Sequence, residues 1–489
     1  MAKITTIKIH PGIGIARLGN SPTGFLIGPE KPGVHTRPGG GYKDKQGRIK
    51  RQAARFRLFG YDKNGKLVKE ITSADAAIEW TVHLANSKAA WNQFDGLKPN
   101  TPLRNASVAD RNSLVIDPGP RSLSGTNKSA SFDTGKFLNT IVPLGEIRSD
   151  SKARLLVLGG FGNSGSPTNA PLTTFANNNG WHDDVSDGPV SATVTLKGSG
   201  KIHEAVGAWV IVGPPKFAPP IENIITLCDV LFVVAVEKLD LKLPPKPSFT
   251  KDIYPLLQRA VAMQWVSGMI TSAHAHATLS AVIPPPASKS ARSAIFNKLR
   301  DPSLPPTQSS GEADMPMIHS DFYPIEVNQP LTRIQYGVMK KWKNGDFIND
   351  WSGPPAPSRR LTPEGLDRAG LESCVGGAFF PGIEASWLLR DVYQFFEPFR
   401  LDPSSLQAGD ITKQMAVPWQ ADFTDCAQEG ELAWWPAQRP DDVFPASGGP
   451  QVPWTRGLVN SMSDMVKNWH RLGFVIKKGG KFVETERNP

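Results

Sequence analysis

Residues 154–167 read RLLVLGGFGNSGSP, an apolar run that ends in a loop of glycine, asparagine, serine and proline. Short apolar runs separated by such loops recur through the first half of the chain, a pattern typical of β-strands joined by turns. We therefore expect a β-rich N-terminal half containing a single helix at about Ser73 to Ser87. The strands are expected at residues 4–10, 55–61, 113–117, 154–159, 190–197 and 208–212.

The glycines at 160, 162 and 165 fit the G-x-G-x-x-G pattern of dinucleotide sites. Such a site needs a helix that opens at the loop, so that backbone N–H groups meet the pyrophosphate. The residues that follow, SPTNAPLTTFANNNGW, are rich in helix breakers, and no βαβ unit surrounds the acid at Asp183. The pattern therefore predicts a structural loop.

The second half of the chain has a different pattern. A proline cluster at Leu243 to Pro247 predicts a boundary between a β-rich domain, residues 1–245, and a mixed, more helical domain, residues 246–489. The overall fold class is therefore α+β, with long ordered loops. Helices are expected at residues 251–269, 290–299, 331–342, 387–396 and 462–473.

Composition narrows the choice of partners. The 489 residues carry a net charge of +10, which favours anionic partners only weakly. The densest basic run, residues 43–57, lacks a nucleic-acid-reading motif, so no nucleic-acid partner is expected. The longest apolar run, residues 224–236, is too short to span a bilayer, and the N-terminus lacks the apolar core of a signal peptide. A cytoplasmic protein without a membrane partner is expected, with non-classical export left open.

Two clusters resemble metal sites. Residues 181–189, WHDDVSDGP, gather three aspartates and a histidine, which could hold calcium or magnesium, but a turn network bonded to backbone donors is the favoured interpretation. His274 and His276 have no third ligand at useful spacing and are interpreted as structural. With both clusters interpreted as structural, no metal site is predicted. G-x-S-x-G, Walker and H-E-x-x-H motifs are absent from the sequence, so standard hydrolase and nucleotide chemistry are poorly supported.

Three widely spaced cysteines, Cys228, Cys374 and Cys426, argue against a disulfide framework and a structural zinc site. Cys426 lies in MAVPWQADFTDCAQEGELAWWPAQRP, residues 415–440, where Asp422 precedes it by four positions. A nearby base can deprotonate a thiol or take a proton from an indole ring, and the thiolate is the reactive form. The alternative for Cys426 and for Cys374 is a small buried hydrophobic residue. The same stretch holds Asp425, Trp419, Trp434 and Trp435.

At these residues the chain resembles the lysine ε-oxidase and glycine oxidase family, whose cofactor is cysteine tryptophylquinone. The resemblance covers most of the chain. Its segments include IHPGIGIARLGNSP (9–22), KRQAARFRLFGYD (50–62), LVLGGFGNSG (156–165), NNGWHDDVSDGPVSA (178–192), DIYPLLQRAVAMQWV (252–266), CVGGAFFPGIE (374–384), GDITKQMAVPWQADFTDC (409–426), WWPAQRPDD (434–442), PWTRG (453–457) and MVKNWHRLGFV (465–475).

The resemblance implies roles for individual residues. Cys426 would be the sulfur donor, Asp422 the acid needed for cofactor maturation, and Cys374 a thiol that lines the active site. Because the spacing from cysteine to tryptophan varies in the family, the crosslinked ring should lie beyond a variable loop. That favours Trp454, with Trp469 as the runner-up, over the nearer Trp434 and Trp435. The chain looks shorter than typical members between residues 442 and 453, which would reshape the substrate channel or mark a different substrate.

The implied activity is that of a quinoprotein amine or amino-acid oxidase. It would deaminate a primary amine through a Schiff base on the quinone, with oxygen as acceptor, and release ammonia and hydrogen peroxide. A quinone-dependent amine dehydrogenase and a non-catalytic scaffold without mature cofactor are the alternatives. The resemblance also implies a flavoprotein maturation partner and a homo-oligomer.

Overall fold

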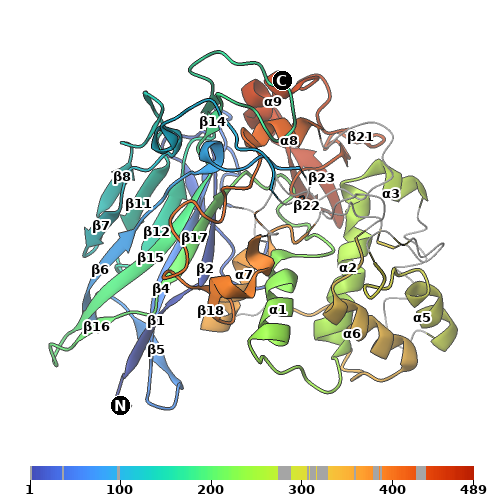
Figure 1. Cartoon of the computed structure of the whole chain (residues 1–489). Helices are drawn as coiled ribbons and strands as arrows, with labels where there is room; N and C mark the ends of the chain where they lie inside the picture. The colour runs from blue at the N-terminus through green and yellow to red at the C-terminus, as the bar shows by residue number, and fades with distance from the viewer. Residues whose placement is uncertain are drawn as a thin grey trace.

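One 13-stranded sheet dominates the N-terminal half of the chain in the computed structural model (Figure 1). The structure describes residues 3–35, 38–95, 98, 100–273, 288–305, 308, 315–316, 329–356, 360–377, 385, 388–425 and 437–488, without the side chains of residues 271–273, 392 and 425. The sheet comprises β1 (Thr6–His10), β2 (Ile13–Arg17), β3 (Phe25–Ile27), β4 (Arg51–Tyr61), β5 (Leu67–Ile71), β6 (Ala76–Val82), β7 (Arg121–Ser124), β8 (Ser129–Phe132), β11 (Gly145–Ser149), β12 (Leu155–Gly159), β15 (Ser186–Leu196), β16 (Ile202–Glu204) and β17 (Ala208–Gly213).

The strand order is β7-β6-β15-β17-β2-β4-β12-β11-β8. Strands β1, β3 and β5 also pair with β4, and β16 pairs with β15. The β17–β2 and β3–β4 pairs are parallel, and the other pairs in this sheet are antiparallel. Strands β7 and β8, at the two ends of the order, follow one another in the chain and contact each other, so the sheet curls back on itself.

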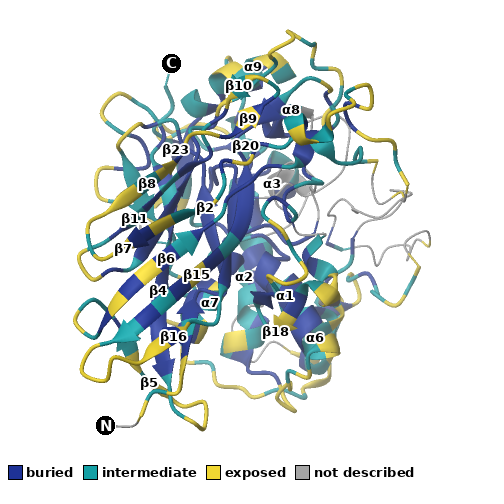
Figure 2. Ribbon diagram, turned by 60° about the vertical axis from the view of Figure 1, so that its left-hand side comes forward, coloured by how far each residue is buried: buried dark blue, intermediate teal, exposed yellow. Residues whose placement is uncertain are grey.

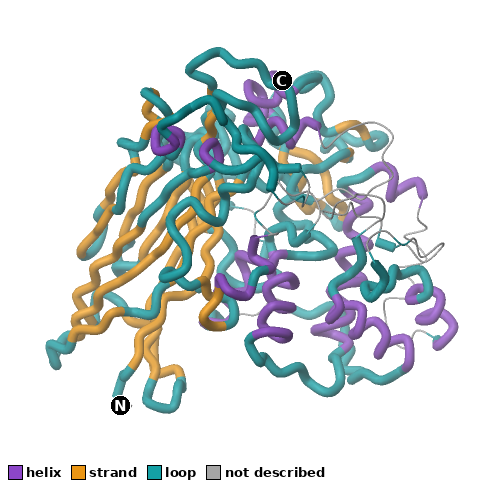
Figure 3. Tube along the Cα trace, viewed as in Figure 1, coloured by secondary structure: helices purple, strands orange, loops and turns teal. Residues whose placement is uncertain are grey.

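The helices gather on one side of this sheet (Figure 3). They are α1 (Leu227–Lys238), α2 (Tyr254–Ala262), α3 (Gly268–Ala273), α5 (Lys289–Phe296), α6 (Arg333–Asn344), α7 (Pro363–Glu372), α8 (Trp419–Asp425) and α9 (Met462–Asn468). Short hairpins complete the described fold: β9 (Lys136–Phe137) with β10 (Thr140–Ile141), β13 (Ser164–Gly165) with β14 (His182–Asp183), β18 (Phe395–Glu397) with β19 (Arg400–Leu401), β20 (Asp442–Val443) with β21 (Val452–Pro453), and β22 (Phe474–Lys478) with β23 (Lys481–Thr485). The predicted α+β class is confirmed.

The central strands supply much of the core. Strands β2, β12 and β17 are buried along their whole length, as is typical of strands that are covered on both faces. The middle of the sheet is accordingly dark blue in Figure 2. One cluster of buried apolar side chains runs from Ile7 to Ile476 and includes residues of both halves. The proposed domain boundary after residue 245 stays a prediction. Among the described residues, no helix combines the length and apolarity needed to cross a bilayer.

Most of the predicted elements are present. The strands expected at residues 4–10, 55–61, 154–159, 190–197 and 208–212 correspond to β1, β4, β12, β15 and β17. The helices expected at 290–299, 331–342 and 462–473 correspond to α5, α6 and α9 with its 3₁₀ extension η7 (Trp469–Arg471). The helix expected at 251–269 is divided into the π-turn η3 (Phe249–Ile253), α2, the 3₁₀ turn η4 (Met263–Trp265) and the start of α3.

The helix expected at Ser73 to Ser87 is wrong. Its alanines and glutamate favour a helix, but residues 76–82 form β6, in which buried and more exposed side chains alternate. Pairing with β15 on one side and β7 on the other overrides the local preference.

Two further predictions need correction. Residues 113–117 are not a strand, because residues 113 and 114 belong to the 3₁₀ turn η2 (Arg111–Leu114). Asp110 caps this turn, and its side chain accepts a hydrogen bond from Asn112 N. Within 387–396, the described residues form 3₁₀ turns η5 (Leu388–Arg390) and η6 (Val392–Gln394) and the start of β18, not one helix. Helices α1, α7 and α8 were not predicted, although the reciprocal cap of Thr226 and Asp229 marks the start of α1.

Trp80, on β6, tests the strand assignment. Its ring is 1% exposed and its Nε1–H donates to Ala153 O at 2.8 Å. Trp80→Ala should lower the free energy of unfolding by about 3–5 kcal/mol, through lost burial and the cavity left behind. Tyr393 is 84% exposed, so Tyr393→Ala is the control and should change stability by less than about 0.5 kcal/mol. Equal losses in denaturant titrations of the two variants would contradict the burial of Trp80.

Candidate functional site

Helix α8 carries Asp422 and leads directly into Cys426, which lies outside the described residues. Residues 419–423 are completely buried or nearly so, and Asp422 is 1% exposed. A helix leaves its first N–H groups without partners inside the helix, so a buried start needs an acceptor from elsewhere. Asp183 supplies it, because its carboxylate accepts from Trp419 N at 3.0 Å.

Asp183 is held by a buried cation. Lys88 Nζ lies 2.8 Å from the Asp183 carboxylate and 2.9 Å from Ala416 O, and neither side chain of the ion pair is exposed. Asn86 Nδ2 donates to the other Asp183 oxygen at 3.0 Å. Burial lowers the pKa of Lys88, and the Asp183 charge opposes that shift. The segment that enters α8 is thereby tied to β14.

Arg104 extends this network. Its guanidinium donates to Lys88 O at 3.1 Å and to Met415 O at 2.9 Å, and burial lowers its pKa to about 9. Sequence reasoning missed Lys88, Asn86 and Arg104 as supports of the site. The only signal was the acidic stretch at 181–189, because a buried aspartate requires a partner of opposite charge.

Trp469 lies against α8. Its ring meets the Trp419 ring edge to face at a centroid distance of 5.5 Å, and α8 packs on α9, which directly precedes Trp469. On another side lies Gly162, where an added Cβ would come within 2.1 Å of the Trp469 ring. Gly162 also has a φ of +74°, a conformation that favours glycine.

Trp454 lies near the other end of α8. Its Nε1–H donates to Gly473 O at 3.0 Å, and its ring contacts Phe217 at a centroid distance of 4.8 Å. The Arg439 guanidinium lies 5.5 Å from the ring centroid and donates from Nε to Phe423 O, on α8, at 2.7 Å. The structure thus brings both predicted indoles to α8, Trp469 by ring contact and Trp454 through Arg439.

Cys374 follows α7 and is fully buried. An Arg17 guanidinium N–H donates to its sulfur at 3.3 Å, and the thiol donates to Gly370 O at 3.3 Å. The Pro214 carbonyl accepts from both Arg17 and Gln438, which connects the surroundings of Cys374 to the chain after residue 436. Trp434, Trp435, His274 and His276 lie outside the described residues.

The acidic stretch forms the predicted turn network. Asp187 accepts from Ile411 N, Thr412 N and Trp209 Nε1, and burial raises its pKa to about 6 against the effect of these bonds. Asp184 accepts from Asn163 N at 3.0 Å, within the glycine-rich loop, and burial raises its pKa to about 7. No helix opens at that loop, which leads into β13. Within the described ranges, no cluster of three potential metal-binding side chains occurs.

Comparisons with known proteins agree over nearly the whole chain. Residues 10–212 match a family model described as L-lysine epsilon oxidase N-terminal, and residues 313–446 match one described as L-lysine epsilon oxidase C-terminal domain. The L-lysine 6-oxidase of Marinomonas mediterranea is 30% identical over an alignment 667 positions long, gaps included, which covers 99% of this chain and 89% of that protein.

Solved structures give the same result. The crystal structure of the L-Lys epsilon-oxidase from Marinomonas mediterranea is similar with a TM-score of 0.82 at 27% identity, covering 99% of this chain and 95% of that chain. The crystal structure of the Schiff base intermediate of that oxidase with L-Lys is similar with a TM-score of 0.81, at the same identity and coverage.

Lys88 tests the support of α8. Lys88→Met leaves the buried Asp183 carboxylate without its cation and should cost about 3–5 kcal/mol of unfolding free energy. The control is Lys98→Met, because the Lys98–Asp95 pair has side chains 48% and 52% exposed and should be worth less than about 1 kcal/mol. Adding Asp183→Asn to Lys88→Met should recover part of the loss. Similar losses for the two lysine variants in chemical denaturation would contradict a structural role for the buried pair.

Asp184 gives a pH test. Its pKa rises from 3.8 to about 7 on folding, so its stabilising contribution is fully present below pH 3.8 and is lost as the pH rises through 7. As the pH rises from 4 to 8, the unchanged protein should therefore lose unfolding free energy that the Asp184→Asn variant does not lose. The difference between the two should change by at most about 1.4 kcal/mol per pH unit. Asp240→Asn is the control, because the Asp240 side chain is 98% exposed. Parallel pH profiles for Asp184→Asn and the unchanged protein would show that Asp184 titrates normally.

Proposed function

Because the chain belongs to the L-lysine ε-oxidase family, we propose that it oxidises a primary amine of an amino acid with oxygen as acceptor, releasing ammonia and hydrogen peroxide. Membership makes it an oxidoreductase that acts on an amino group. The observation that carries the proposal is the likeness, over 99% of the chain, to an oxidase captured as a Schiff base with L-Lys. The buried acid and indoles around α8 support it.

We propose that the cofactor is cysteine tryptophylquinone, formed from Cys426 and one indole. The described residues fit this group, because Asp422 is buried on the helix that leads into Cys426 and two buried indoles flank that helix. Once formed, the quinone would accept two electrons from the amine. Trp454 remains the predicted partner, and the ring contact with Trp419 supports the alternative, Trp469.

The side chains around α8 would each have a separate task. Asp422 would take the proton from the Cys426 thiol or the indole as the crosslink forms, and is the candidate base for the proton on the amine-bearing carbon. Asp422 is 1% exposed, so its carboxyl group is shielded from bulk water. Cys374, held by Arg17, would line the site, as the family resemblance implies.

Two partners follow from the same proposal. A flavoprotein would mature the cofactor, so chain produced alone should carry unmodified Cys426, Trp454 and Trp469. A homo-oligomer is the proposed assembly, and size-exclusion chromatography with light scattering would measure it.

The decisive experiment is a peptide map by mass spectrometry on protein from its native host. The peptide with Cys426 should be joined to one tryptophan peptide, with two oxygens gained and four hydrogens lost. Cys426→Ser should abolish the link, quinone absorbance and peroxide release, and Asp422→Asn should leave most of the chain unlinked. Cys228→Ala is the control, because Cys228 lies buried on α1 and should not affect the link.

Trp454→Phe and Trp469→Phe are the matched pair that identifies the ring, since only one should lose the crosslink. Retention of quinone absorbance in Cys426→Ser would overturn the cofactor assignment. Amine oxidation without peroxide release would replace the oxidase with a dehydrogenase.

A further inference from the structure

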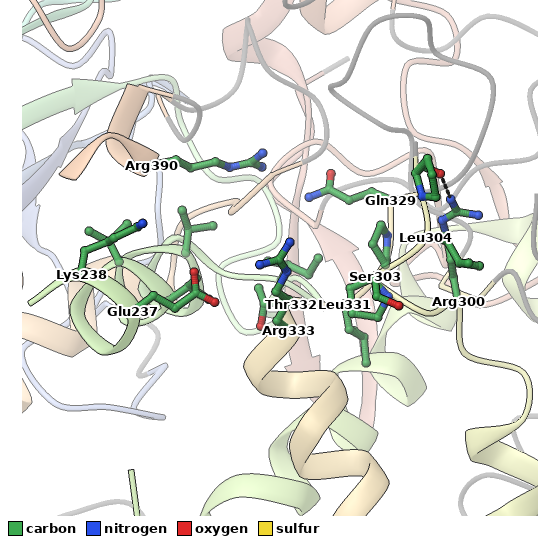
Figure 4. Close-up of a pocket in the computed structure, with 17 residues that line it drawn as sticks. Glu237, Lys238, Arg300, Ser303, Leu304, Gln329, Leu331, Thr332, Arg333 and Arg390 are labelled. Carbon is green, nitrogen blue, oxygen red and sulfur yellow. Dashed lines mark hydrogen bonds between the residues drawn. The ribbon is translucent and has the colours of Figure 1, made fainter. Parts of the chain in front are cut away.

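A pocket of about 580 Å³ opens between α1, the start of α6 and the segment 300–305 (Figure 4). Its volume is in the range of small-molecule sites. Apolar residues of α1, among them Val230 and Val234, form one wall, and Gln329 to Arg333 form another. No residue on its lining belongs to α8, so the pocket is a feature separate from the indole cluster.

The charged side chains on the lining are mostly cations. Among the described residues of the lining they are Lys238, Arg300, Arg333 and Arg390, with Glu237 as the one acid. Arg390 and Gln329 extend toward one another, and Arg333 reaches up beneath the space between them (Figure 4). Arg300 is 1% exposed and is fixed at the far side by a bond from Nη2 to Pro305 O at 2.9 Å. Helix α6 also begins here, and the positive end of its dipole adds to the potential.

The polar groups suit an anion with an ammonium close to it. Arginine is the side chain best matched to a carboxylate, because its N–H groups form paired charge-assisted bonds. Gln329 is 7% exposed, and its side-chain oxygen has no hydrogen-bond partner among the described residues. A buried amide oxygen of this kind is available to a donor such as an ammonium group.

The pocket adjoins the segment that follows Cys374. Ile225, on its lining, accepts from Gly376 N through its carbonyl at 3.0 Å. Gln329 lies so close to Gly377 that a Cβ there would come within 2.5 Å of its Nε2. Ile225 and Gln329 thus connect the pocket lining to the segment that carries Cys374, the thiol that the resemblance places at the active site.

We propose that this pocket binds the carboxylate of the amino-acid substrate, with Arg333 and Arg390 as the binding cations. The inference rests on the proposed function and deepens it. Substrates with a free carboxylate are then selected over simple amines of the same length.

Binding is tested without turnover by calorimetry, using hexanoate and its uncharged analogue hexanamide, neither of which carries an oxidisable amine. Hexanoate should bind more tightly than hexanamide. The double variant Arg333→Gln, Arg390→Gln should weaken hexanoate binding about tenfold or more, the loss expected for charge-assisted bonds. Lys340→Gln is the matched control, since Lys340 is an exposed cation of α6 outside the pocket lining. Arg333→Gln alone, at an exposed position, serves if the double variant does not fold.

The second test is kinetic. It measures kcat/KM for 6-aminohexanoate and for hexylamine and compares the ratio of the two values between variants. The ratio should exceed one in the unchanged enzyme and fall about tenfold or more in the double variant. Equal binding of hexanoate and hexanamide, or a proportional fall for both amines, would overturn the pocket assignment. A matured chain that binds hexanoate as expected and yet oxidises no amine would overturn the proposed function. That result would leave the carboxylate site supported.

Discussion

A charged carboxylate is costly to bury unless a cation and hydrogen-bond donors surround it. The buried carboxylate of Asp183 has both. One of its oxygens accepts from Lys88 Nζ and from Trp419 N, and the other accepts from Asn86. Because Lys88 also bonds Ala416 O, the same cation fixes the segment that enters α8. The direction of α8, and with it the position of Asp422, is therefore set by a pair of charges whose residues are 95 positions apart in the chain.

The glycine-rich loop after β12 supports the same helix from another side. The side chain of Gln420, on α8, donates to Gly162 O and accepts from the Ser164 hydroxyl. The Asp184 carboxylate also binds the loop, by accepting from Asn163 N. The missing side chain of Gly162 leaves room for the Trp469 ring. A glycine pattern that resembles a phosphate site thus brings an indole and α8 together. The sequence argues against a nucleotide site through the helix breakers that follow the loop and through the absence of a βαβ unit around Asp183.

Local pattern predicted much of the fold from the sequence. Strands β12 and β17 were found because each is a continuous apolar run, and α6 because its buried residues recur at helical spacing. Strand β6 was missed because its alanines and glutamate favour a helix, and only its two neighbouring strands decide otherwise. Helix α8 has seven residues, so its formation depends on Asp183 and not on local periodicity. For the candidate site, the resemblance predicts Cys426, Asp422, Cys374 and the two indoles, and these stay predictions. Sequence reasoning could not give Lys88 or Arg104, because long-range contacts alone connect them to α8.

The short connection between residues 442 and 453 has a simple structural form. Strands β20 and β21 pair directly, with Asp442 opposite Pro453, and Trp454 N donates to Asp441 O just beyond the pair. A paired hairpin brings the two ends of its loop together, so a change of loop length need not move the residues outside it. Trp454 is therefore held next to the paired strands through Asp441, and not by the loop between them. A difference in substrate from longer relatives would then arise from side chains around the site, and the cationic pocket beside the Cys374 segment is our candidate for that role.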